Sequence, residues 1–154
     1  MSRVLSVLFF SFFSLFAVEN TPPKVQWKPY SQALEQSSKD KKMVFTYLWA
    51  TWCISCRTME KNVFSDSTVV NILNTKFHSV KLDVNSKEDI VCDGKRKTVE
   101  RCFFDIWNLN GVPSFVLIAP KGLSILTLTQ TLEAAEMRHL LKHFLNKEKE
   151  WVQE

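Results

Sequence analysis

The sequence predicts an α/β fold in which a central mixed β-sheet is flanked by helices on both faces. Strand-length apolar runs alternate with segments of helical spacing along the chain, which is the order typical of such a fold. Residues 43–49 are almost continuously apolar, as in a strand buried on both faces. Residues 132–146 are amphipathic, as in a closing helix. A chain of 154 residues accommodates one domain of this kind.

The first half of the chain predicts a helix, a strand, further helix and a second strand. A first helix is expected over residues 30–38 and a first strand over 43–49. Helical spacing resumes from Cys56 through Val63 and again after an N-cap at Ser65 or Asp66, so one kinked helix or two consecutive helices would fit. Residues 77–84 are expected to form a strand parallel to the first, reached by a right-handed crossover.

The second half begins with a polar stretch that we expect to be an inserted loop around residues 86–102. A helix is expected over 99–109, ending at Asn110-Gly111. Val112-Pro113 follows, and then strands over 114–119 and 123–128 with a turn between them. The helix over 132–146 completes the order.

Composition disfavours nucleic acid as a partner. The 20 Lys and Arg residues outnumber the 16 Asp and Glu residues by only four, and no basic run is interleaved with aromatic residues. Ordinary hydrophobic content with only three glycines also argues against a fibrous or a disordered chain.

The N-terminus has the pattern of a secretory signal peptide. Arg3 supplies a positive charge, residues 4–18 are apolar apart from serines, and a polar, proline-containing segment follows. The apolar segment is shorter than the ~20 residues that a spanning helix needs, which favours cleavage over a membrane anchor. We therefore expect a signal peptide at 1–17, possibly extending to 20, a mature domain at 21–154, and an exported, periplasmic protein.

Cys53 and Cys56 form a Cys-x-x-Cys motif directly after the first predicted strand. At the start of a helix the two thiols lie on one face, and the unpaired N–H groups together with the helix dipole favour a thiolate. We assign Cys53 as the nucleophile and Cys56 as the resolving thiol, with no metal and no cofactor beyond their redox-active disulfide. A structural disulfide or half of a zinc site are the alternatives, although Cys92 and Cys102 would complete a zinc site poorly.

Two motifs in the right order resemble the thioredoxin superfamily, and most of all the C-terminal periplasmic domain of the membrane disulfide reductase DsbD. The first is Trp-Ala-Thr-Trp-Cys-Ile-Ser-Cys-Arg at 49–57, followed by Met59-Glu60 and by Val-Phe-Ser-Asp at 63–66. The second is Gly-Val-Pro-Ser-Phe-Val-Leu-Ile at 111–118. The resemblance covers roughly residues 25–144.

This resemblance implies a thioredoxin fold and a thiol–disulfide oxidoreductase of the protein-disulfide reductase type. It implies a cis Pro113 beside the disulfide, with the backbone of Val112 pairing with a substrate strand and Trp52 shaping a docking surface. Expected partners are protein disulfides or dithiols, with a membrane electron donor or another exported oxidoreductase as the relay. An oxidase or isomerase, a metal-binding chaperone and a non-catalytic interaction module are the alternatives.

The sequence departs from the family pattern at the position that handles the proton of the buried thiol. Family members commonly place Asp six residues before the first cysteine, where this chain has Tyr47. Glu60 matches an acidic position of the DsbD-like domain and is our candidate proton acceptor. The alternative is a solvated helix residue that contacts Arg57. The dipeptide Ile54-Ser55 leaves the redox potential open.

Cys92 and Cys102 flank a basic segment in the expected insertion. In an exported protein they are expected to form a structural disulfide that closes this loop. A second redox relay or a pair of free thiols are the alternatives.

Overall fold

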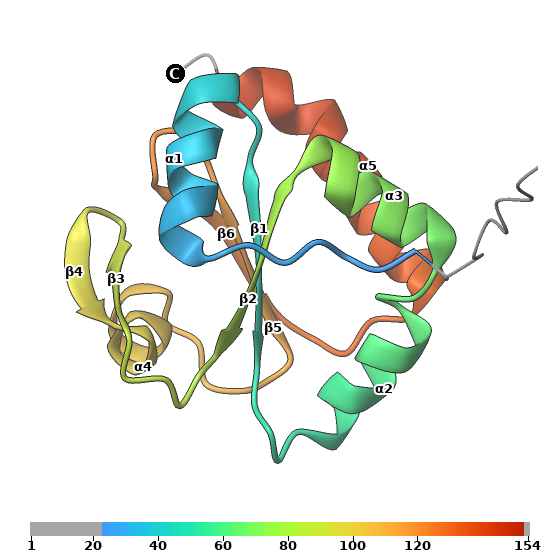
Figure 1. The fold of residues 1–154 in the computed structure, drawn as a ribbon, viewed down its shortest axis with the longest axis horizontal. Helices are drawn as coiled ribbons and strands as arrows, with labels where there is room; N and C mark the ends of the chain where they lie inside the picture. Colours follow the sequence, from blue (N-terminus) through green and yellow to red (C-terminus); the bar gives the residue numbers. More distant parts are fainter. Residues whose placement is uncertain (1–22, 153–154) are drawn as a thin grey trace, which may run out of the picture.

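Four strands form the central sheet, in the spatial order β2-β1-β5-β6 (Figure 1). β1 is parallel to β2 and antiparallel to β5, and β5 is antiparallel to β6, so the predicted mixed sheet is confirmed. The predicted parallel pairing of the first two strands is confirmed as well. The strands are β1 (Val44–Trp49), β2 (His78–Asp83), β5 (Ser114–Ile118) and β6 (Ser124–Thr129).

The computed structural model describes residues 23–152, and the predicted signal peptide lies outside them. Within the described range, no helix combines the length and the apolar character that crossing a membrane requires.

Helices cover both faces of the sheet, as predicted (Figure 1). α1 (Tyr30–Asp40) lies on one face, and α2 (Ile54–Asn62), α3 (Ser67–Lys76) and α5 (Ala134–Val152) lie on the other. Asp66 separates α2 from α3, because its carboxylate caps α3 by accepting the Val69 N–H at 3.0 Å. The same carboxylate binds Arg138 of α5 at 2.6 Å, which ties these two helices together.

The expected inserted loop is partly regular structure, which corrects the sequence analysis. β3 (Asp89–Cys92) and β4 (Lys95–Thr98) form an antiparallel hairpin, followed by the short α4 (Val99–Arg101) and a π-helical segment η1 (Cys102–Ile106). Asp93 and Gly94 both have positive φ, the backbone that tight hairpin turns require. Two short four-residue strands in a polar stretch were too weak a pattern to predict, although Asp-Gly is itself a hairpin signal.

A disulfide joins this hairpin to η1. Cys92 at the end of β3 is bonded to Cys102 at the start of η1, and both residues are fully buried. The carboxylate of Asp93 at the hairpin turn accepts hydrogen bonds from the N–H and the hydroxyl of Ser124, both at 2.6 Å. The turn end of the hairpin is therefore fixed both to the sheet, through Asp93, and to η1, through Cys92.

The aromatic core lies under β1, all of whose residues except the last are buried. The rings of Phe45 and Tyr47 each stack on Phe115 of the neighbouring strand, with centroids 5.7 and 5.8 Å apart. Stacked aromatic pairs add stabilisation beyond the area they bury. β1 is thus a rigid platform for the segment that leaves its C-terminal end.

Replacing both Cys92 and Cys102 by alanine should lower the free energy of unfolding by about 2–3 kcal/mol, because the bridge closes a short loop in the unfolded chain. Urea unfolding followed by circular dichroism measures the change. An unchanged midpoint would show that the disulfide adds nothing to stability.

Alkaline pH should reveal that both tyrosines are buried. Burial raises the pKa of Tyr30 and of Tyr47 above the ordinary value near 10, and the charges of Asp93 and Glu60 respectively raise them further. A raised pKa in the folded state gives stability that is complete below pH ~10 and is lost as the pH rises above it. Tyrosinate absorbance at 295 nm should therefore appear only together with loss of the circular dichroism signal.

Tyr47→Phe provides the control, because one fewer buried phenol should make this loss of stability with pH less steep. Titration of both tyrosines near pH 10 in a fully folded protein would contradict the prediction.

Candidate active site

The predicted redox pair lies where β1 gives way to α2. Cys53 is the N-cap of α2, and its Sγ accepts a hydrogen bond from the Cys56 N–H at 3.1 Å. The two cysteines form a disulfide, with their Cα atoms 5.3 Å apart. The Ser55 hydroxyl lies 3.4 Å from Cys53 Sγ. Once the disulfide is reduced, these groups and the helix dipole favour a thiolate on Cys53.

An open groove of about 560 Å³ exposes this disulfide from one side. Cys53 lines the groove and Cys56 does not, and their exposed fractions are 3% and 0%. Trp52 and Ile54 project beside it with exposed fractions of 63% and 73%. Cys53 is therefore the member of the pair that lies at the groove. The complete lining is Trp52, Cys53, Ile54, Ser55, Thr58, Val112 and Thr131.

Val112 and Pro113 approach the same groove from the start of β5. The peptide bond between them is cis, as the family resemblance implies. Val112 is half-buried and lines the groove, whereas the next residue, Pro113, is buried and does not line it. Of the residues singled out in the sequence, the groove therefore brings together Trp52, Cys53 and Val112, with Cys56 bonded to Cys53.

Glu60 lies on α2 away from the groove and contacts a strand, not Arg57. Its Oε1 is buried and lies 2.8 Å from Nζ of Lys81 on β2, a contact that is an ion pair by distance but lacks hydrogen-bond geometry. The Lys81 ammonium also lies 4.0 Å from the ring centre of Trp49, as in a cation–π contact. Arg57 instead donates a hydrogen bond to the Thr51 carbonyl at 2.8 Å.

Lys81 is a site residue that the sequence analysis missed. It is the residue directly opposite Tyr47 in the parallel pairing of β1 with β2, so it becomes visible only once the register is known. One signal in the sequence could have identified it. A lysine within a largely buried strand needs a partner of opposite charge.

Tyr47 occupies the position where the family pattern has an acid, and it cannot act as a base. Its hydroxyl donates a hydrogen bond to the Cys56 carbonyl at 3.4 Å, and its ring is wholly buried. Burial and the nearby Glu60 carboxylate raise the pKa of Tyr47, which keeps the phenol neutral across the physiological range. Glu60 is thus an acidic group close to Tyr47, whose hydroxyl contacts the Cys56 carbonyl.

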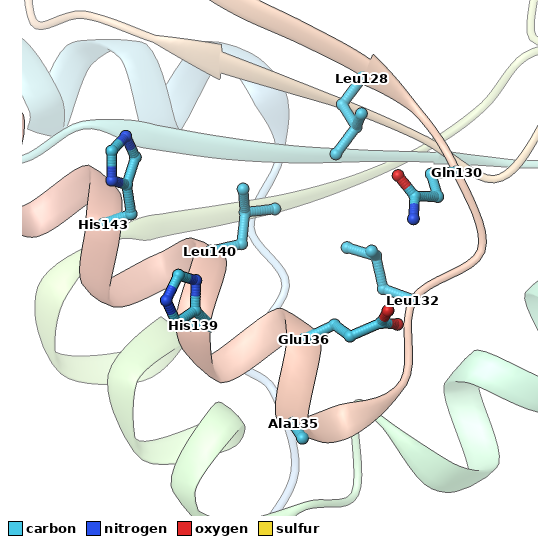
Figure 2. A pocket seen from close by; sticks show the side chains of 8 residues that line it. All are labelled: Leu128, Gln130, Leu132, Ala135, Glu136, His139, Leu140 and His143. Carbon is cyan, nitrogen blue, oxygen red and sulfur yellow. The ribbon is translucent and has the colours of Figure 1, made fainter.

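A larger hollow of about 680 Å³ lies between β6 and α5, where Leu128 and Leu140 point toward one another (Figure 2). Its lining includes His139 and His143 but none of the predicted site residues. Within the described part of the chain, no group of three or more His, Cys, Asp or Glu side chains could hold a metal ion. We place the chemistry at the smaller groove because the disulfide is there.

Several known proteins are similar to this chain in sequence or in fold. The disulfide bond reductase DsbH of Chlamydia pneumoniae is 25% identical over 99 residues, which are 64% of this chain and 58% of DsbH. Two further curated relatives, from Caenorhabditis elegans and Rattus norvegicus, match over only 11% and 10% of their lengths. This chain therefore spans less than two thirds of these curated relatives.

Two solved structures show the same fold. A thioredoxin from Thermus thermophilus superposes with a TM-score of 0.65 at 23% identity, covering 81% of this chain and 90% of that one. The reduced DsbD C-terminal domain of Neisseria meningitidis superposes with a TM-score of 0.57 at 17% identity, covering 73% and 91%. A family model described as a thioredoxin-like domain matches residues 30–145, and because that match spans most of the chain, the protein belongs to the thioredoxin-like domain family.

Proposed function

We propose that this protein is an exported thiol–disulfide oxidoreductase that reduces disulfides of other exported proteins or relays electrons to them. The observation that carries the proposal is the Cys53–Cys56 disulfide at the N-terminus of α2, with one sulfur lining a groove and the other buried. The similarity to DsbH, a disulfide bond reductase, supports the reductive direction.

Reduction begins on Cys53. Its thiolate, stabilised by the Cys56 N–H and the helix dipole, attacks one sulfur of a substrate disulfide. A bond forms between Cys53 Sγ and that sulfur while the substrate S–S bond breaks, and the departing thiolate takes up a proton. The cis Val112-Pro113 segment on the other side of the groove is suited to holding the substrate backbone during this step.

Cys56 completes the exchange. Its thiol must lose a proton before Cys56 Sγ can attack Cys53 Sγ, and we propose Glu60 as the acceptor. The attack forms the Cys53–Cys56 disulfide, breaks the mixed disulfide and releases the second substrate thiol. Two electrons and two protons have then passed to the substrate. The ion pair with Lys81 fixes the position of the Glu60 carboxylate on the side of α2 that faces β2.

The oxidised protein then needs a dithiol to restore its own cysteines. A membrane electron donor or another exported oxidoreductase would supply it, and the cysteine pair would need no further cofactor. The N-terminal signal peptide pattern supports a periplasmic place of action, where substrate disulfides persist.

The purified protein should catalyse insulin reduction by dithiothreitol, and Cys53→Ser should abolish that catalysis because no thiolate remains to attack. Precipitation of the insulin B chain, followed by turbidity, measures the rate. The double variant in which Cys92 and Cys102 become alanine is the matched control and should retain activity.

Equal activity in Cys53→Ser would overturn the assignment. Equilibration with glutathione buffers tests the direction: a reduction potential near about −270 mV fits a reductase, whereas one near about −120 mV would contradict that direction and indicate an oxidase.

Glu60→Gln should slow the second half of the reaction by at least about tenfold near neutral pH, because the Cys56 proton loses its acceptor. The rate should recover as the pH rises and the thiol ionises unaided. Rapid quenching with acid, followed by mass spectrometry of the mixed disulfide, measures its lifetime. Glu100→Gln, which removes a surface ion pair with Lys87, is the charge-matched control. A wild-type lifetime in Glu60→Gln would exclude Glu60 as the proton acceptor.

A further inference from the structure

A second trough continues from the active-site groove. It has a volume of about 370 Å³ and lies between α2 and the beginning of α5. Thr58 and Thr131 line both hollows, so a chain bound at Cys53 can pass between these two side chains into the trough without leaving the surface. A volume of this size is within the range of about 300–1,000 Å³ that ligand pockets have.

The trough has an apolar floor and a polar rim. Met59, Val63 and Leu132 are buried and form the floor. Exposed side chains surround them, namely Thr58, Asn62, Thr131 and Glu133. Burial of an apolar ligand side chain against this floor is favourable, and the hydroxyl and amide groups of the rim can form hydrogen bonds with the ligand backbone.

Glu133 brings a negative charge to this rim. Its backbone is occupied by the start of α5, since its carbonyl accepts the Met137 N–H at 2.9 Å and its N–H donates to Glu136 at 2.8 Å. Within the described residues its carboxylate has no cationic partner. Arg138, the basic side chain nearest in sequence, is bound to Asp66 at 2.6 Å. A basic group on a ligand would find an unpaired carboxylate here.

We propose that this trough is a second substrate subsite, which holds the extended polypeptide segment next to the target cysteine and selects an apolar residue followed by a basic one. The inference rests on the proposed function, because continuity with the disulfide groove identifies the occupant as substrate polypeptide. An extended chain advances about 3.3 Å per residue with alternating side chains, so residues on one side of the cysteine can reach the floor and then Glu133.

Fluorogenic disulfide-linked peptides test the subsite. One peptide carries Leu and Lys beyond its cysteine, a second carries Leu and Glu, and a third ends at the cysteine. Each of the two extended peptides is made in two versions, with the extension on the N-terminal or on the C-terminal side of the cysteine. For the wild type, one of the two versions of the Lys peptide should have a kcat/KM at least about fivefold higher than that of the truncated peptide. The preference for Lys over Glu should be up to about fivefold, as for an exposed ion pair.

Two variants change the trough without touching the cysteines. Glu133→Lys should reverse the preference between the Lys and Glu peptides, and Asn62→Trp should bring the extended peptides down to the rate of the truncated one. Glu88→Lys makes the same charge change directly before β3, in the hairpin that lies across the sheet from α2 (Figure 1), and should keep the wild-type preferences. Circular dichroism establishes that each variant is folded.

Equal rates for extended and truncated peptides in both directions, or an unchanged preference in Glu133→Lys, would overturn the subsite while leaving the oxidoreductase proposal intact. Fluorescence anisotropy separates the two proposals, using a labelled Lys peptide whose cysteine is replaced by alanine. If the wild type bound this peptide, Asn62→Trp weakened the binding, and the wild type reduced no disulfide, the result would support the trough and refute the proposed function. Absence of both binding and peptide preference would refute the trough.

Discussion

The first turn of α2 has backbone N–H groups that no carbonyl of the helix can reach, and the Sγ atom of Cys53 accepts one of them. This single contact caps the helix and polarises the sulfur at once. It holds only because β1, buried along nearly its whole length, fixes the position at which the chain leaves the sheet. The stacked rings of Phe45, Tyr47 and Phe115 thus contribute to the geometry of the disulfide as well as to the core.

Tyr47 lies against the Cys56 carbonyl, at the position where the family pattern noted above predicts an acid, and the ion pair of Glu60 with Lys81 lies near it. Tyr47 fills the volume and stays neutral, while Glu60 brings the charge from α2 and Lys81 compensates it from β2. The Lys81 ammonium also lies over the Trp49 ring, and this cation–π contact ties the lysine to the end of β1.

The sequence was most informative where one signal was strong and local. The continuous apolar run predicted β1 directly, and the Cys53–Cys56 spacing marked the redox candidate. The sequence offered Ser65 or Asp66 as the N-cap of α3 and left one or two helices open, and the structure has Asp66 and two helices. The cis bond at Pro113 followed from family resemblance alone, because most X–Pro bonds are trans. The β3–β4 hairpin was missed since its strands are short and polar, and Lys81 was missed because strand register is a property of tertiary structure.

The two disulfides of this chain differ in access rather than in composition. Exchange requires an attacking thiolate to reach a sulfur atom, and Cys53 meets that condition at the groove. Cys92 and Cys102 are sealed between the hairpin and η1, so a thiol of this protein or of its neighbours cannot approach them while the chain is folded. This difference in burial would let the proposed thiol–disulfide exchange use the Cys53–Cys56 bond while the Cys92–Cys102 bond stays intact.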